Sequence, residues 1–275
     1  MQGNESAGEE SVAGQRAPAY YLSLGDSLST GVQPIGPEDR QFRTFEGYAD
    51  QLAESARRYL PGLRLVKLGY PGESTTTMID GSLCEYTHGS QLHEAVWFLR
   101  EHRESVAFVT IDIGINDIAT RDLEGIAPGM AVAGRNLPGI LNELREAAGP
   151  TTPIVGMTIY DPYLAGWLDG PLGQALARIS VFDAVLPINA HLAEIYRAAG
   201  MAVADVEGAF STTDFETLVP IEGSGEVPLN VARILDWTWA GTPPPLGPDI
   251  HANGRGYRVI AEAFEQVLFP GDTAP

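Results

Sequence analysis

The chain has 275 residues, of which 44% are hydrophobic and 19% charged, values that are ordinary for a soluble globular protein and exclude a disordered polypeptide. Its 17 basic and 36 acidic residues give a net charge of -19, which would repel nucleic acids and anionic membrane surfaces. Lys67 is the only lysine, so the chain lacks the phosphate-binding loop of nucleoside triphosphatases.

The two ends of the chain differ in character from the middle. Residues 1–17 form a polar tail without the apolar core of a secretory signal, and residues 18–270 are predicted to form one domain. No apolar run reaches the length of a membrane span. A polar start fits a mature secreted protein and equally a cytosolic one; we expect a secreted protein. The single cysteine, Cys84, excludes an intramolecular disulfide. The oligomeric state stays open.

Apolar runs of strand length alternate with segments of helical periodicity. The predicted strands are residues 20–24, 63–68, 106–113, 153–159 and 201–206, and the predicted helices are residues 45–59, 91–101, 130–148, 172–199 and 256–268. Because a parallel return needs a crossover, this alternation predicts an α/β fold with a mostly parallel sheet of about five strands. The Pro- and Gly-rich region 209–247 is predicted as a long irregular loop that could cover a substrate.

Polar motifs follow three of the predicted strands. They are GDS at 25–27, PGES at 71–74 and GIND at 114–117. In an open parallel sheet the functional crevice lies outside the carboxyl ends of the strands, so these motifs should meet there. A serine in this position becomes a nucleophile only if a base within hydrogen-bond reach takes its proton.

His251 is the best-placed of the five histidines to be that base. It stands in a loop just before the last predicted helix, where an imidazole can turn back over the sheet edge, and Asp249 lies two residues upstream. Acyl transfer also needs donors for the developing oxyanion. The backbone N–H of Gly72 and the side-chain amide of Asn116 are suited to that role. The spacing of the acidic residues and histidines matches no metal site, and we expect no metal and no cofactor.

Four motifs in this order resemble the SGNH, or GDSL-type, serine hydrolase family. They are GDSLS at 25–29, PGES at 71–74, GIND at 114–117 and DIHAN at 249–253, and the resemblance covers residues 19–269. It implies a flavodoxin-like three-layer α/β/α sandwich and the hydrolysis of carboxylic acyl esters. It also implies Ser27 as nucleophile, His251 as general base and then acid, and an oxyanion hole made by the Ser27 and Gly72 backbone N–H groups and the Asn116 amide.

The chain departs from the family pattern at two positions. The family usually places its triad acid three residues before the histidine, where this chain has Pro248. Either Asp249 reaches the histidine, which we favour, or a backbone carbonyl orients the ring. Lys67 stands where relatives often have an asparagine that braces the loop beneath the site, so that brace should be weaker here.

Other readings of the motifs stay open at this stage. Ser27 could be only a helix N-cap, Gly72 a plain turn residue, and Asn116-Asp117 the cap of the next helix. A non-catalytic binding module on the same fold is the alternative to an enzyme. Among enzymes, a lipase, a short-chain esterase, a thioesterase and a carbohydrate deacetylase all fit, because loops build the pocket. The expected substrate is a small-molecule or lipid ester, and the acidic surface favours a neutral one.

Overall fold

The computed structural model describes residues 19–34, 41–118 and 123–271. The polar tail predicted at 1–17 lies outside these residues. Within them, a sheet of parallel strands runs in the order β4-β1-β5-β6-β7, and the five predicted strands are confirmed. Their bounds are β1 (Tyr20–Gly25), β4 (Arg64–Lys67), β5 (Val106–Asp112), β6 (Ile154–Met157) and β7 (Ala202–Ala204).

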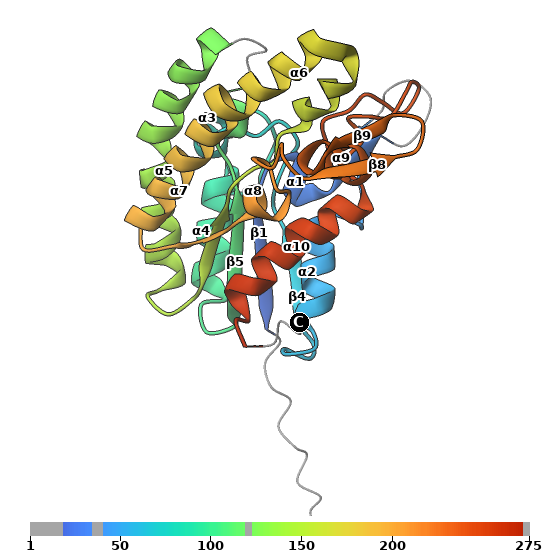
Figure 1. Ribbon diagram of the computed structural model, residues 1–275. Helices are drawn as coiled ribbons and strands as arrows, with labels where there is room; N and C mark the ends of the chain where they lie inside the picture. Colours follow the sequence, from blue (N-terminus) through green and yellow to red (C-terminus); the bar gives the residue numbers. More distant parts are fainter. Residues whose placement is uncertain (1–18, 35–40, 119–122, 272–275) are drawn as a thin grey trace, which may run out of the picture.

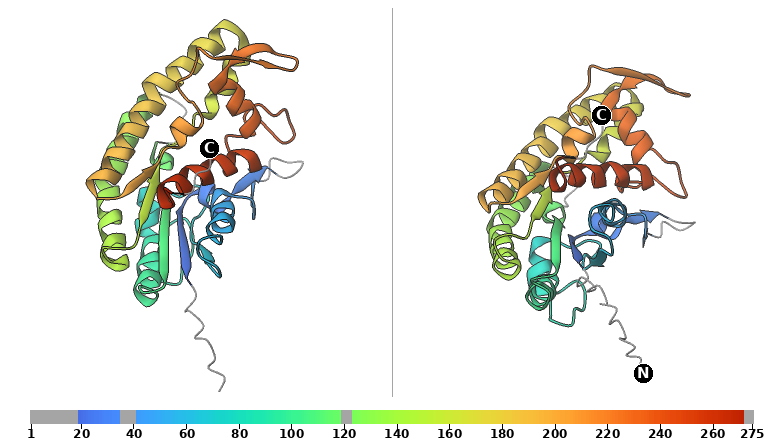
Figure 2. Two further views of the ribbon diagram at one scale, coloured as in Figure 1. Left: turned by 60° about the horizontal axis from the view of Figure 1, so that its bottom comes forward. Right: turned by 90° about the horizontal axis from the view of Figure 1, so that it is seen from below.

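Helices cover both faces of the sheet, which gives the three-layer α/β/α sandwich (Figures 1 and 2). Helices α4 (Gln91–Glu101), α5 (Ile126–Ala148) and α7 (Leu186–Ala198) form one layer, and α2 (Tyr48–Ala56) and α10 (Gly254–Leu268) form the other. The carboxyl ends of the strands lie at the top of Figure 1, next to α1 (Ser27–Thr30).

The buried side chains explain why these segments form these elements. The β1 residues Tyr21, Leu22 and Leu24 are completely buried, because a central parallel strand is covered on both faces. Helix α10 buries Tyr257, Ile260 and Phe264, which recur at helical spacing along one face. The Phe264 ring stacks on Tyr48 of α2 with 5.0 Å between ring centroids, so the last helix is bound to the first half of the chain.

The predicted helices differ from the structure mainly at their ends. Helix α5 begins at Ile126, earlier than the predicted residue 130. The predicted helix 172–199 is α6 (Gly170–Ile179), a π-helix η4 (Ser180–Val185) and α7, and a 3-10 helix η3 (Pro162–Asp169) precedes it.

The continuous helical stretch Pro162–Ala198 is, by length and composition alone, apolar enough to cross a membrane. Core helices of soluble proteins pass the same test. The α7 part of this stretch packs against β6 and β7 and belongs to the sandwich.

The region 209–247 is less irregular than its composition indicates. It contains a hairpin of β8 (Leu218–Ile221) and β9 (Gly225–Pro228), followed by α9 (Leu229–Trp237), after the short α8 (Val206–Ala209). Prolines inside both short strands hide the alternation that marks a strand. Helix α9 buries Val231 and Ile234, so part of the region packs on the core. A substrate-covering role for it stays a prediction.

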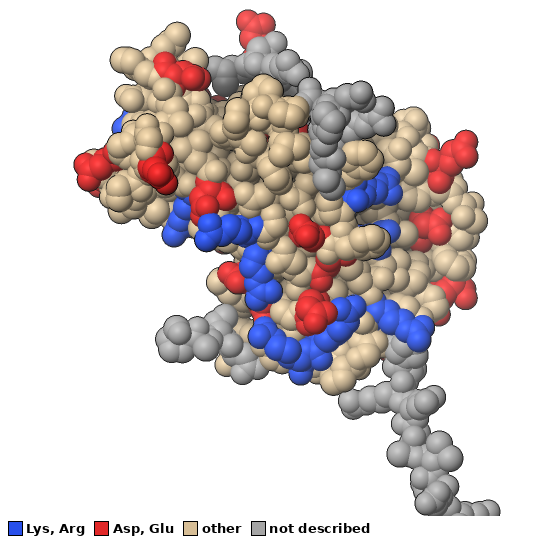
Figure 3. Space-filling view, turned by 90° about the vertical axis from the view of Figure 1, so that its right-hand side faces the viewer, with Lys and Arg blue, Asp and Glu red and all other residues tan. Residues whose placement is uncertain are grey.

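Shorter elements complete the described part of the chain. They are β2 (Val32–Pro34), β3 (Gln41–Arg43), α3 (Thr75–Asp80), η1 (Ile115–Asp117) and η2 (Leu123–Gly125). On the face seen in Figure 3, basic side chains are interleaved with acidic ones. The ion pairs of the described residues include Lys67–Asp50 and Arg255–Asp236.

Candidate active site

The GDS motif forms the turn between β1 and α1. Asp26, rather than Ser27, is the N-cap of α1, since its carboxylate accepts the backbone N–H of Leu28 at 3.0 Å. Ser27 is the first residue of the helix and is partly exposed at the carboxyl edge of the sheet. The turn requires Gly25, because it has a φ of 130° and an added Cβ would lie 2.2 Å from the Asp112 carbonyl oxygen.

The loop that carries Gly72 is docked on the end of β1. The Tyr70 backbone N–H donates to the Gly25 carbonyl at 3.0 Å. The buried side chain of Gln91 accepts the Gly25 N–H at 2.7 Å and donates to the carboxylate of Glu73 at 3.1 Å. Gly72 itself has a φ of 83°, a conformation that favours glycine. The PGES motif is therefore held against the GDS motif by side chains that lie between them.

Asn116 connects three of the sequence motifs. Its Nδ2 donates to Asp26 Oδ2 at 3.1 Å and to the Glu73 carbonyl oxygen at 2.9 Å. The neighbouring Asp117 accepts the Thr75 N–H at 2.8 Å and the Thr75 hydroxyl at 2.6 Å. Asp117 thus binds the start of α3. Residues 119–122, which follow it, lie outside the described residues, so the capping alternative stays a prediction.

His251 and Asp249 form a close pair. The ring Nδ1 of His251 lies 2.7 Å from Asp249 Oδ1, which also accepts the His251 backbone N–H at 2.9 Å. A spacing of two residues therefore suffices for the contact. His251 is 5% exposed, and the Tyr160 hydroxyl fixes the loop by donating to the Ile250 carbonyl at 2.9 Å.

His251 also acts electrostatically on the GDS motif. Burial raises the pKa of Asp26 above its usual range, and the nearby His251 partly offsets that rise. Trp239 links the two loops directly, since its backbone N–H donates to the His251 carbonyl at 3.0 Å and its indole N–H donates to Gln33 Oε1, just after α1, at 3.2 Å. The structure thus brings the histidine loop and the GDS turn together at one edge of the sheet.

Lys67 does not brace the loop beneath the site. Its Nζ donates to Asp50 Oδ2 at 2.7 Å and to the Thr44 carbonyl at 3.1 Å, which ties β4 to α2. Bracing of the 69–74 loop comes from Gln91 and from the Tyr86 hydroxyl, which donates to the Leu68 carbonyl at 2.7 Å. This role of Gln91 could not be predicted from the sequence, since nothing local marks a glutamine on an amphipathic helix as a bridge between loops.

A second carboxyl group, Asp112, lies beneath the site at the end of β5. It is 4% exposed, and its Oδ1 accepts the Tyr48 hydroxyl at 2.6 Å while its Oδ2 accepts the Ser29 N–H at 3.2 Å. Asp112 was not among the residues predicted for the site. An acidic residue inside the apolar run 106–113 was the available signal, because such groups are rarely buried without a reason.

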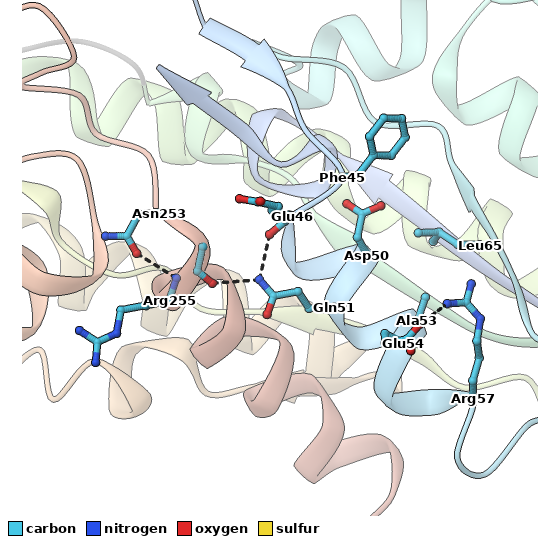
Figure 4. A pocket seen from close by; sticks show the side chains of 11 residues that line it. Phe45, Glu46, Asp50, Gln51, Ala53, Glu54, Arg57, Leu65, Asn253 and Arg255 are labelled. Atoms are coloured by element: carbon cyan, nitrogen blue, oxygen red, sulfur yellow. Dashed lines mark hydrogen bonds and ion pairs between the residues drawn. The ribbon is translucent and has the colours of Figure 1, made fainter. Parts of the chain in front are cut away.

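A groove of about 770 Å³ lies between α2 and the start of α10 (Figure 4). Gln51, which lines this groove, donates to the Glu46 carbonyl oxygen (Figure 4) and to the Gly254 carbonyl oxygen, both at 2.9 Å. The groove reaches Asn253, two residues after His251, and lies beside the assembled motifs rather than between them. Among the residues that the structure describes, no three of His, Cys, Asp or Glu are gathered as a metal site would require.

Comparison with known proteins identifies the family. The model of the GDSL-like lipase/acylhydrolase family matches residues 23–259. The chain belongs to this family. A search of curated protein sequences found no significant match. Membership makes the protein a carboxylic ester hydrolase and confirms the resemblance of its four motifs.

Solved structures of several hydrolases share the fold. An extracellular lipase from Streptomyces rimosus is 21% identical with a TM-score of 0.55, covering 89% of this chain and 99% of its own. An acetyl xylan esterase from Geobacillus stearothermophilus is 18% identical with a TM-score of 0.53, at 91% and 94% coverage. A lipase from a goat rumen metagenome is 17% identical with a TM-score of 0.53, at 92% and 99% coverage. At these identities the likeness establishes the fold alone.

Proposed function

We propose that this hydrolase cleaves neutral carboxylic esters through an acyl-enzyme on Ser27. The observation that carries the proposal is the His251–Asp249 pair, with 2.7 Å between Nδ1 and Oδ1, at the sheet edge where Ser27 begins α1. A carboxylate on Nδ1 holds the neutral ring in the tautomer whose Nε2 can accept a proton. Family membership supports the same chemistry.

The proposed reaction has two halves. In the first, Ser27 Oγ attacks the ester carbonyl carbon while His251 Nε2 takes the hydroxyl proton, and the tetrahedral intermediate collapses by passing that proton to the leaving alcohol. In the second, His251 takes a proton from a water molecule that attacks the acyl carbon, and it returns that proton to Ser27 Oγ as the bond between Oγ and the acyl carbon breaks and the acid leaves. Asp249 stabilises the imidazolium that forms in both halves.

The oxyanion is proposed to bind the Ser27 and Gly72 backbone N–H groups and the Asn116 amide. Both hydrogens of that amide are engaged in the free protein, one on Asp26 and one on the Glu73 carbonyl. The amide hydrogen that Asn116 donates to Asp26, at the longer distance of 3.1 Å, is therefore the one proposed to be shared with the oxyanion. The shorter bond to Glu73 keeps the amide in place.

Two observations bear on the alternatives named above. Asp249 contacts the histidine ring despite the two-residue spacing, which argues against a binding module with a misaligned histidine and acid. Lipases and acetyl xylan esterases both occur among the structural neighbours, so we carry two substrate classes, long-chain acyl esters and acetylated carbohydrates. A net charge of -19 favours uncharged members of either class.

The test compares wild-type protein with Ser27→Ala. We expect a fluorophosphonate to form one adduct per chain on the wild type, mapped to Ser27 by mass spectrometry, and none on the variant. The variant should lose about 10³-fold or more of the kcat on p-nitrophenyl esters, since its nucleophile is gone. Circular dichroism serves as the control for folding. A panel from acetate to palmitate, with acetylated xylan beside it, separates the substrate classes.

A folded wild-type protein that hydrolyses esters without labelling at Ser27 would overturn the proposed nucleophile. Equal activity in the Ser27→Ala variant would do the same.

A further inference from the structure

Two buried carboxyl groups lie in contact under the GDS turn. Asp26 is 1% exposed and Asp112 is 4% exposed, both line one small cavity, and each side chain acts on the pKa of the other as a hydrogen-bond partner. A hydrogen bond between two carboxyl groups needs a proton on one of them, because ionised carboxylates only accept. The parallel pairing of Gly25 with Asp112 in β1 and β5 brings the two groups together.

The donors around each group indicate which one keeps the proton. Asp26 accepts the Leu28 N–H at 3.0 Å, the Asn116 amide at 3.1 Å and the Ser27 hydroxyl at 3.4 Å, and His251 lies near it. Asp112 accepts one hydroxyl and one N–H. The group with more donors and a nearby imidazole is the better place for the negative charge.

The surroundings of Asp112 disfavour a second charge. Burial, and then the proximity of Asp26, raise the pKa of Asp112 well above its usual range. A cavity of about 10 Å³ beside both carboxyl groups is lined largely by apolar side chains, among them Ile113 and Leu192, and offers little room for water.

Among the described residues, four buried phenols also face Asp112. They come from β1, α2, α7 and α10 and are Tyr21, Tyr48, Tyr196 and Tyr257. Burial raises the pKa of each phenol, so all four stay neutral over the working range of the enzyme. Asp26 is then the acidic group in this cluster whose charge responds to the state of Asp112.

We propose that Asp112 is a positioning residue of the active site, a neutral acid whose O–H donates to the Asp26 carboxylate and so fixes Asp26 against Ser27 and Asn116. This inference rests on the proposed function, because Ser27 and Asn116 are the nucleophile and an oxyanion donor there. Asp112 touches no substrate and acts through Asp26.

Loss of the Asp112 proton has two consequences for the reaction. Two carboxylates in contact repel, so Asp26 moves away from the Ser27 hydroxyl and the Asn116 amide. The net charge beneath the oxyanion also changes from -1 to -2, which opposes the negative charge that develops in the transition state. Both effects lower kcat at alkaline pH and leave substrate binding nearly unchanged.

The test uses Asp112→Asn and Asp112→Ala in the full chain. The asparagine amide donates to Asp26 as the acid does but does not titrate, so we expect Asp112→Asn to keep kcat within about threefold at neutral pH. Its alkaline fall in kcat should move up by at least about one pH unit, since the titrating proton is gone. Asp112→Ala removes the O–H that Asp112 is proposed to donate to Asp26, and we expect kcat to fall by tenfold or more with KM within about twofold.

Asp161→Asn is the matched control. Asp161 is another fully buried carboxyl near the end of the neighbouring strand β6, where burial raises its pKa to about 6, and it caps η3. This variant should leave both kcat and its pH profile unchanged. A control that shifts the profile as Asp112→Asn does would overturn the assignment to Asp112.

Two further outcomes contradict the inference. An Asp112→Asn variant with the wild-type alkaline limb shows that the Asp112 proton does not control the reaction. An Asp112→Asn variant that is as impaired as Asp112→Ala shows that the site needs a carboxylate there. If Asp112→Ala fails to fold, the pH profile of Asp112→Asn decides alone. Phosphonate labelling of the wild type at Ser27 separates these failures from failure of the proposed function.

Discussion

At the scale of single residues, the site depends on a few short contacts between side chains that come from separate loops. The distance of 2.7 Å between His251 Nδ1 and Asp249 Oδ1 is typical of a charge-assisted hydrogen bond. Asp249 Oδ1 accepts the His251 backbone N–H at the same time, so one carboxylate oxygen fixes both the loop and the ring. The departure at Pro248 therefore leaves the histidine with an acidic partner.

Asp249→Asn tests that partner. An asparagine keeps the shape of the side chain but lets the ring settle in the wrong tautomer, which in a serine protease triad lowers kcat by about 10⁴-fold. We expect a loss of at least about 10²-fold here, with KM nearly unchanged. Steady-state kinetics on a p-nitrophenyl ester measures it, and His251→Ala sets the scale of complete loss. If the activity of Asp249→Asn stayed within about threefold of wild type, a backbone carbonyl rather than Asp249 would orient the His251 ring.

At the scale of elements, the strand ends decide where the chemistry is placed. Strands β1 and β5 are neighbours in the sheet, and the close approach of β5 to the GDS turn leaves no space for a side chain at Gly25. This glycine combines a φ of 130° with a steric conflict, whereas Gly62 has a φ of 84° with no atom within 4 Å of an added Cβ. Substitutions at these two glycines therefore separate the cost of backbone strain from the cost of a steric clash.

Gly25→Ala and Gly62→Ala form a matched pair. The Gly62 variant adds only a left-handed conformation for a non-glycine residue and should lower the free energy of unfolding by about 1–2 kcal/mol. The Gly25 variant adds a clash with the backbone of Asp112, and we expect a loss of more than about 3 kcal/mol. Urea unfolding measures both. Equal losses in the two variants would mean that the strand end yields to the added methyl group.

At the scale of the whole molecule, the excess of acidic over basic residues opposes the compact state. Three of the described ion pairs, Arg57–Glu54, Arg255–Asp236 and Arg258–Glu262, are exposed on the surface, where each contributes little. Repulsion among the remaining carboxylates acts over the whole surface and is screened by salt. For a net charge of -19, we expect added salt to stabilise the folded protein, because it should reduce the repulsion among carboxylates more than it weakens the ion pairs.

A thermal unfolding series in sodium chloride tests this balance. Between about 20 mM and about 300 mM salt at pH 7, where the screening length falls from about 20 Å to about 6 Å, we expect Tm to rise by a few degrees. The same series near pH 4.5, where the sequence predicts little net charge, should give a smaller rise. A fall in Tm with salt at pH 7 would show that the ion pairs stabilise the fold by more than the repulsion among carboxylates destabilises it.

The sequence by itself determined the layered α/β architecture and the motifs that carry the chemistry. Five apolar runs predicted the five parallel strands, because strands covered on both faces must be apolar along their length. Helix α4 matches its predicted range 91–101, since a serine cap and an amphipathic pattern both act locally. The β8–β9 hairpin was not predicted, because its prolines interrupt the alternation of polar and apolar residues that marks a strand.

Only the tertiary structure decided how the motifs are joined. Gln91 bridges Gly25 and Glu73, Asn116 bridges Asp26 and Glu73, and Asp112 lies against Asp26. Each contact depends on which strands are neighbours and on their register, which long-range packing sets rather than any local pattern. The contact between Asp249 and His251 also depends on tertiary structure, because the turn that forms it is held by the Trp239 backbone and by the hydroxyl of Tyr160, which lies far away in the sequence.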